Sequence, residues 1–322
     1  MIKSFIKDHL PLFFRLLKLL KKTDYRFLTG LPKITQKDYI HSIKSNEEGN
    51  ELIYQLLSCK QPCMISRLGS AELTVLLNTQ FIREGKMKQW NMDSIEEGLF
   101  RMNAVFPAEI ATLELFSDVY FSAMSSIDAL AVWYNYGEQL MHRKYFSSAS
   151  LFPIESLEPF RFNQPWSRAL KNKKVLVVLP FEQSVKNQFA NRSKLFSDKD
   201  VLPDFDLTIY RPFNSYTDKP AQGKSWFDYL EKMKQDICSI DFEIALIAAG
   251  PFGLPLAAAV KANGRKAVHV GGALQLLFGI KGNRWEERPE FAAYMNEHWV
   301  KPLANEIPEE ETKQKIDNSS YW

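Results

Sequence analysis

The chain has 322 residues, 45% of them hydrophobic, which is enough to bury the core of one large α/β domain. Its formal net charge is only +3, and no basic stripe interleaved with aromatics lies beyond the first helix, so we expect no nucleic-acid partner. Its three cysteines, Cys59, Cys63 and Cys238, form no metal-ligand array, which favours reduced thiols in the cytoplasm.

Residues 1–28 predict an amphipathic N-terminal helix. Within residues 1–22 lysines flank an apolar face, which is typical of a helix on an anionic membrane surface, and a helix docked on the protein core shows the same pattern. Pro11, Arg15 and Lys18 interrupt the apolar run, so we expect neither a membrane span nor a signal peptide. The expected localisation is cytoplasmic, with peripheral binding to the inner face of the cell membrane under the first interpretation.

Residues 29–300 read as a single α/β domain, because apolar runs of strand length alternate with helical patterns. Strands are predicted at 63–66, 129–133, 174–179, 207–211, 244–249 and 266–270, and helices at 37–58, 71–78, 182–189, 225–239 and 254–262. This alternation predicts a Rossmann-like parallel sheet with helices on both faces. Residues 86–125 indicate a helical insertion, and residues 301–322 a polar C-terminal tail.

The turn from Ser66 to Glu72 joins a predicted strand to a predicted helix. Gly69 permits a sharp turn, and the helix start, with Ser70 as its expected cap, exposes N–H groups that favour a phosphate. Arg67 adds a planar cation suited to phosphate oxygens. Glu72 then lies beside a sugar hydroxyl, a metal ion or an attacking oxygen; alternatively it only interacts with the helix dipole and pairs with Arg67.

Similar turns follow three later strands. Ser184 lies in the first turn of the helix predicted after Pro180, where ordinary helix capping is the alternative interpretation. The strand at 244–249 ends at a Gly-Pro-Phe turn, and the next strand ends at His269, before two glycines that allow close approach of a ligand. The G-x-G-x-x-G fingerprint is missing, and Val268-His269 stands where a dinucleotide ribose requires an acid, so an NAD enzyme is disfavoured.

A basic-aromatic loop, Lys281 to Trp285, completes the set. Its two cations suit a diphosphate, and a solvated loop with a buried tryptophan is the alternative. The residues that we expect to bind a nucleotide diphosphate are Arg67, Gly69, Ser70, Pro180, Ser184, Gly250, Pro251, Phe252, Gly271, Gly272, Lys281 and Arg284.

Together these stretches resemble the bacterial GT-D type glycosyltransferases. The turn ISRLGSAEL is similar to the R-x-G-D-x-E turn of that family, and VLVVLPFEQSVKNQF resembles its strand, Pro-Phe and helix. The segment IALIAAGPFGLPLAAAVKANGRKAVHVGG resembles its strand–Gly-Pro–helix–Gly–strand unit, which ends in D-I-G. The resemblance covers residues 60–80 and 170–285, in the same order.

The resemblance implies transfer of a sugar from a nucleotide-sugar donor, usually UDP-linked, to a glycan, lipid-linked or protein-linked acceptor in bacterial surface-polysaccharide synthesis. It implies Glu72 as a catalytic base or as a ligand of Mn²⁺ or Mg²⁺, and His269 is our second expected catalytic residue. Ser70 replaces the first acid of the family motif, which leaves a metal-independent reaction open. In that case the cations Arg67, Lys281 and Arg284 would offset the diphosphate charge.

The sequence is also compatible with two functions other than glycosyl transfer. One is another nucleotide-dependent α/β enzyme, such as a methyltransferase that uses the turn at 249–253, although the ribose-binding acid is missing there as well. The other is a non-catalytic, membrane-associated scaffold.

Overall fold

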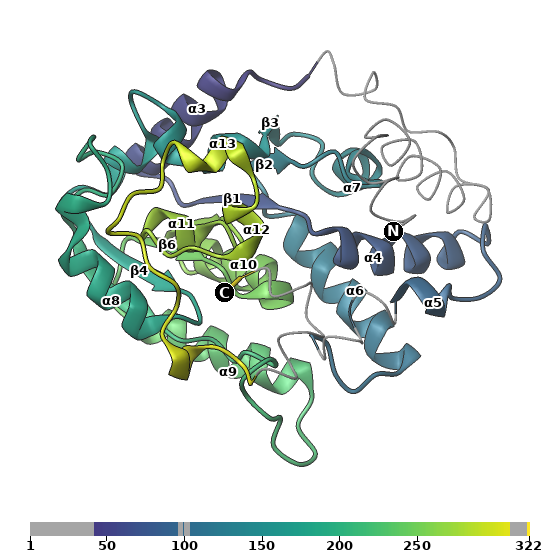
Figure 1. Cartoon of the computed structure of the whole chain (residues 1–322). Coiled ribbons are helices and arrows are strands. Elements are labelled where there is room, and N and C mark those ends of the chain that lie inside the picture. The colour runs from purple at the N-terminus through teal and green to yellow at the C-terminus, as the bar shows by residue number, and fades with distance from the viewer. Residues whose placement is uncertain (1–41, 96–98, 100–103, 310–320) are drawn as a thin grey trace, which may run out of the picture.

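The computed structural model of the chain describes residues 42–95, 99, 104–309 and 321–322. Seven strands form one sheet in the order β3-β2-β1-β7-β6-β4-β5, and every pair of neighbours is parallel (Figure 1). This confirms the predicted Rossmann-like α/β fold. The amphipathic helix predicted for residues 1–28 lies outside the described residues.

The first half of the chain supplies one edge and the middle of the sheet. Its elements are α3 (Asn46–Ser58), β1 (Cys63–Arg67), α4 (Ser70–Arg83), α5 (Met92–Ile95), α6 (Ile110–Met124), β2 (Ala129–Val132), α7 (Glu138–Tyr145) and β3 (Ser150–Pro153). Three 3-10 turns, η3 (Ile154–Leu157), η4 (Pro159–Arg161) and η5 (Trp166–Leu170), then lead across to the second half. The short edge strand β3 ends at a proline and has no sequence prediction that corresponds to it.

The second half alternates strands and helices more regularly. Its elements are β4 (Lys174–Val178), α8 (Glu182–Ala190), η6 (Arg192–Lys194), β5 (Asp206–Tyr210), α9 (Trp226–Ser239), β6 (Ile244–Ile247), η7 (Gly250–Phe252), α10 (Gly253–Ala262) and β7 (Lys266–His269). The short helices α11 (Leu274–Leu277), α12 (Asn283–Glu286), α13 (Pro289–Ala292) and η8 (Ala304–Glu306) follow.

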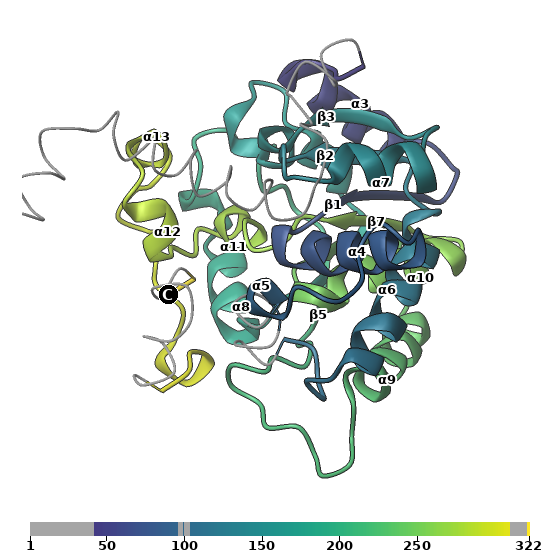
Figure 2. The same cartoon turned by 90° about the vertical axis from the view of Figure 1, so that its right-hand side faces the viewer.

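Helices cover both faces of the sheet because its strands are apolar on both faces. Met64, Leu130 and Leu176 point into a core shared with α4, α6, α9 and α10. Ile65 and Val177 point into the opposite core, shared with α3, α8 and α11–α13. Figure 2 shows α4, α6 and α10 on one side of the molecule and α11–α13 on the other.

Two local expectations differ from the structure. Ser70 is the first helical residue of α4, whereas Gly69 occupies the N-cap without a side-chain hydrogen bond, so the predicted capping by Ser70 is wrong. Trp322 is buried in the core, although residues 301–322 read as a polar tail. Of the helices within the described residues, none combines the length and the apolarity of a membrane-spanning segment.

Candidate functional site

A pocket of about 280 Å³ opens at the carboxyl edge of the sheet, and loops after β1, β2, β4, β5, β6 and β7 line it. Ligands bind at this edge in doubly wound sheets. All the site residues predicted from the sequence line the pocket except Ser184 and Lys281. Those in the lining are Arg67, Gly69, Ser70, Glu72, Pro180, Gly250, Pro251, Phe252, His269, Gly271, Gly272 and Arg284.

The turn between β1 and α4 brings Arg67 and Glu72 together over Gly69. A Cβ on Gly69 would collide with the Glu72 carboxylate and would lie 3.0 Å from Arg67 Nη2, so a larger residue here would displace these two side chains. The guanidinium of Arg67 lies 4.7 Å from the centre of the Trp133 ring. Its Nε is buried, and among the described residues it has no hydrogen-bond partner. The residue also lines the pocket, where its planar cation favours an anionic ligand.

His269 lies at the end of β7, between β1 and α10. Its Nδ1 is 3.0 Å from Ser66 Oγ, and its Nε2 faces Gly253 so closely that a Cβ there would collide with it. Burial, together with the positive charge of Arg67, lowers the pKa of His269 to about 3. The ring is therefore neutral at physiological pH. It packs between Ser66 and Gly253 at the pocket lining. Its catalytic role stays a prediction.

Gly271, which follows β7, leaves space for the side chain of the same arginine. Gly271 has φ +75°, a conformation that glycine adopts at little cost. A Cβ at this position would lie 2.5 Å from Arg67 Nη1. The sequence therefore provides space for the guanidinium from the β7 side as well.

The Gly-Pro-Phe turn before α10 is fixed from two sides. The Tyr120 hydroxyl donates to the carbonyl of Pro251 at 2.6 Å, and burial beside the negative charge of Glu72 raises the pKa of Tyr120, which keeps that donor protonated. Phe252 stacks on Trp226 with ring centres 4.9 Å apart. The backbone of the turn therefore has a fixed position at the pocket wall.

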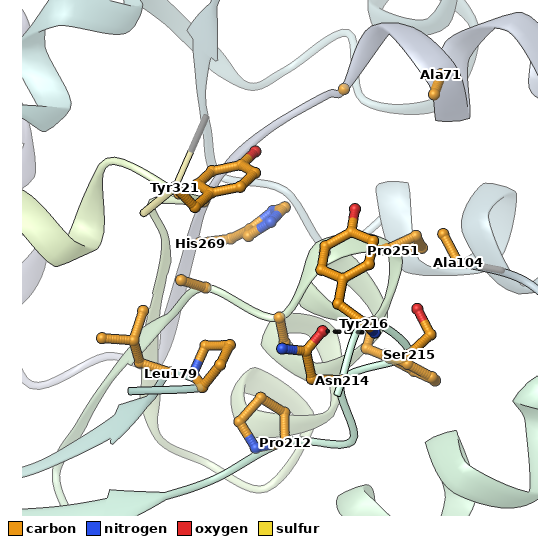
Figure 3. Close-up of a pocket in the computed structure, with 18 of the residues that line it drawn as sticks. Ala71, Ala104, Leu179, Pro212, Asn214, Ser215, Tyr216, Pro251, His269 and Tyr321 are labelled. Carbon is orange, nitrogen blue, oxygen red and sulfur yellow. Dashed lines mark hydrogen bonds between the residues drawn. The ribbon is translucent and has the colours of Figure 1, made fainter. Parts of the chain in front are cut away.

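Aromatic side chains that the sequence did not indicate also line the pocket. Among them are Trp133 after β2, Tyr216 after β5, and Tyr321 and Trp322 at the C-terminal end. Figure 3 shows Tyr216, Tyr321 and His269 around the same hollow, with the backbone N–H of Tyr216 donating to Asn214 Oδ1 at 3.2 Å. The β5 loop directly follows a predicted strand, so its place at the carboxyl edge was open to inference from the sequence.

Tyr321 is held against the pocket by neighbours from α11 and α12. Gln275 Nε2 donates to its carbonyl at 3.1 Å, and the guanidinium of Arg284 lies 5.3 Å from the centre of its ring. A Cβ at Gly272 would collide with the same ring. Arg284 therefore lies against the ring of Tyr321, as Arg67 lies against the ring of Trp133.

Ser184 and Lys281 have other partners. The Ser184 hydroxyl and the backbone N–H groups of Gln183 and Ser184 all donate to the carboxylate of Glu306, which caps α8. Lys281 forms an ion pair with Glu286 at 3.4 Å. The structure therefore does not bring these two predicted residues into the pocket.

The donor set does not fit a divalent cation held by the protein alone. Among the described residues, no group of three or more His, Cys, Asp or Glu side chains converges on a metal position. Within the described lining, Glu72 is the single acidic side chain, whereas Ca²⁺ or Mg²⁺ requires several oxygen ligands.

Among the side chains of the lining, Arg67 and Arg284 are positively charged, Glu72 is negatively charged and His269 is neutral, so these side chains together carry a net positive charge that suits an anion. Comparison of the chain with protein-family models, curated proteins and solved structures gave no match. The chemistry of the pocket is therefore the basis for inferring what the chain does.

Proposed function

We propose that this chain is a glycosyltransferase that uses a nucleotide-sugar donor, with a UDP-sugar as the first candidate. The acceptor would be a glycan, lipid-linked or protein-linked chain in bacterial surface-polysaccharide synthesis. The observation that carries the proposal is Arg67, whose buried Nε has no acceptor and whose guanidinium lines a pocket at the carboxyl edge of the sheet. A donor diphosphate would pair with this guanidinium through charge-assisted hydrogen bonds.

The neighbouring groups suit the two ends of such a donor. The diphosphate would contact Arg67 and the backbone at the start of α4, where helical N–H groups have no intrahelical acceptors. The base would stack on the aromatic side chains of Tyr216, Tyr321 and Trp322 through its π face, and the ribose would lie beside it. Arg284 lies against the Tyr321 ring and would offset further phosphate charge.

The chemical step in this proposal is displacement at the anomeric carbon. An acceptor hydroxyl attacks that carbon, the bond from the carbon to the diphosphate oxygen breaks, and the electron pair leaves with the diphosphate. Glu72 takes the hydroxyl proton, which is the role of a general base. Arg67 stabilises the charge that develops on the leaving diphosphate. Peripheral binding through residues 1–22 would bring this pocket close to a lipid-linked acceptor.

Calorimetric titration with UDP and with GDP, each with and without Mn²⁺, tests the proposal. We expect UDP to bind with a dissociation constant in the micromolar-to-millimolar range, and Arg67→Ala to weaken binding about tenfold or more, because a charge-assisted hydrogen bond is lost. Arg83→Ala is the matched control, since Arg83 pairs with Asp118 at the far end of α4.

Three outcomes contradict the proposal. Neither nucleotide binds in that range, or Arg67→Ala binds UDP as well as the unchanged protein does. In the third, S-adenosylmethionine binds in place of UDP, which favours the methyltransferase-like alternative.

A further inference from the structure

Glu138 is a fully buried carboxylate that does not itself line the pocket. It is the first residue of α7, and its side chain is 0% exposed. Its carboxylate accepts hydrogen bonds from the backbone N–H of Trp133, at 3.1 and 3.2 Å, and from that of Asn135, at 3.1 Å. Burial raises the pKa of Glu138 to about 8, and the hydrogen bonds from the turn after β2 act in the opposite direction, because they stabilise the ionised form. The two carboxyl oxygens thus serve as buried acceptors for the N–H groups of this turn.

The backbone of that turn needs such support. Tyr134 has φ +56°, which is an uncommon conformation for a residue with a bulky side chain. Gly137 has φ +92°, and a Cβ there would lie 2.5 Å from Leu77 of α4, so the turn also fits closely against that helix. A free turn of this sequence would relax to other conformations, and the Glu138 carboxylate opposes this by binding N–H groups on both sides of Tyr134.

The other side of the same turn contacts the arginine of the pocket. The Trp133 ring lies against the Arg67 guanidinium at 4.7 Å, a distance typical of cation–π contacts. Asn135 Nδ2 donates to the carbonyl of Leu68, the residue after Arg67, at 3.1 Å. The turn therefore touches both the side chain and the backbone of the Arg67 segment.

We propose that Glu138 is a positioning residue of this site. By binding the N–H groups of Trp133 and Asn135, it holds the indole ring against Arg67 and so aims the guanidinium at the bound anion. The identification of that anion as a donor diphosphate rests on the proposed function, whereas the link from Glu138 to Arg67 does not.

Glu138→Gln is the most direct variant. The glutamine side chain has nearly the same shape, but in either orientation its amide N–H₂ would face the backbone N–H of Trp133, which lies within 3.2 Å of both carboxyl oxygens of Glu138. We expect the turn to open and Trp133 to leave Arg67. Trp133→Leu removes the ring itself, and Trp133→Phe keeps an aromatic face for the cation. Because Trp133 is 40% exposed, its variants test the link even if Glu138→Gln fails to fold.

Two measurements without ligand follow the link directly. Amide hydrogen exchange at Trp133 to Asn135 should accelerate about tenfold or more in Glu138→Gln, because local opening then requires less free energy. Modification of Arg67 by phenylglyoxal, quantified on its peptide, should also accelerate in Glu138→Gln and Trp133→Leu but stay near the original rate in Trp133→Phe. Glu158→Gln is the matched control, because Glu158 is a largely buried glutamate that pairs with Arg161 outside the pocket.

Titration with UDP adds a functional readout. Glu138→Gln and Trp133→Leu should weaken UDP binding about tenfold, which corresponds to the loss of one well-placed charged hydrogen bond, while Trp133→Phe and Glu158→Gln stay within about threefold. If the unchanged protein does not bind UDP, the proposed function fails and the ligand-free measurements alone decide the inference. Unchanged Arg67 modification in Glu138→Gln and Trp133→Leu, or equal acceleration in Glu158→Gln, would overturn it.

Discussion

The position of Arg67 depends on one glycine close to it in sequence and on two residues that are distant from it. Gly69 and Gly271 leave space for its guanidinium, and Trp133 lies against it. The sequence indicated Arg67 as a phosphate ligand because it follows a strand and precedes a glycine turn. It did not indicate Trp133 or Glu138, because their relation to Arg67 arises from the pairing of β1 with β2 and not from any local pattern.

His269 gives a prediction about acid stability. Its pKa is about 3 in the folded protein and about 6.5 in an unfolded chain, so between these values the unfolded state binds more protons. The free energy of unfolding should therefore fall as the pH decreases from 6.5 toward 3, with a slope of up to about 1.4 kcal/mol per pH unit. Urea unfolding of the unchanged protein and of His269→Gln, at a series of pH values, measures this contribution.

His298→Gln serves as the control, since the His298 side chain is exposed and lies outside the pocket. We expect its pH profile to follow that of the unchanged protein. An equally steep profile in His269→Gln would show that other groups cause the acid sensitivity.

At the scale of elements, six of the seven strands could be predicted from the sequence, whereas the edge strand β3 could not. The runs at 175–178 and Ile244–Ile247 are apolar throughout, which is typical of strands buried on both faces. The strand Ser150–Pro153 is short and ends in proline, so its strand character comes from pairing with β2. Tyr321 was equally out of reach, because only tertiary packing brings it to Gly272.

Helix α8 gives a prediction at this scale. The Glu306 carboxylate accepts from Gln183 N at 2.6 Å and from Ser184 N at 3.1 Å, so it satisfies N–H groups at the helix start and stabilises the helix dipole. Glu306→Gln should lower the free energy of unfolding by about 0.5–2 kcal/mol, as the loss of a helix cap does. It should also increase amide exchange at the start of α8.

Chemical denaturation and hydrogen exchange measure these two effects. Glu309→Gln is the matched control, because Glu309 is exposed and lies only three residues after Glu306 in the sequence. Equal stability and equal exchange in both variants would mean that Glu306 does not support the helix.

At the scale of the whole molecule, the pocket lies across a junction between the two halves of the chain. Strand β1 pairs with β7, and Ser66 contacts His269, which is 203 residues away in sequence. Pairing over such a separation in a parallel sheet forms slowly. Arg67 and Trp133 belong to one half, whereas Tyr216 and His269 belong to the other. The pocket is therefore complete only when the junction has closed.

A ligand of the pocket should consequently act on unfolding more than on folding. If β1 and β7 join after the folding transition state, UDP at about 100 times its dissociation constant should stabilise the protein by about 2.7 kcal/mol, mostly by slowing unfolding. Unfolding and refolding rates in urea, with and without UDP, provide the measurement, and Arg67→Ala should show a much smaller effect. Acceleration of refolding by a similar factor would instead place the junction early in folding.

The distribution of tryptophans gives the molecule an optical property of its own. Five of the seven, Trp166, Trp226, Trp285, Trp299 and Trp322, are buried, whereas Trp133 is exposed beside the Arg67 cation. Indole emission responds to nearby charge and to water, and an anion bound at Arg67 changes both. The chain therefore carries an intrinsic fluorescent reporter of pocket occupancy, placed on the side chain that is proposed to aim the arginine.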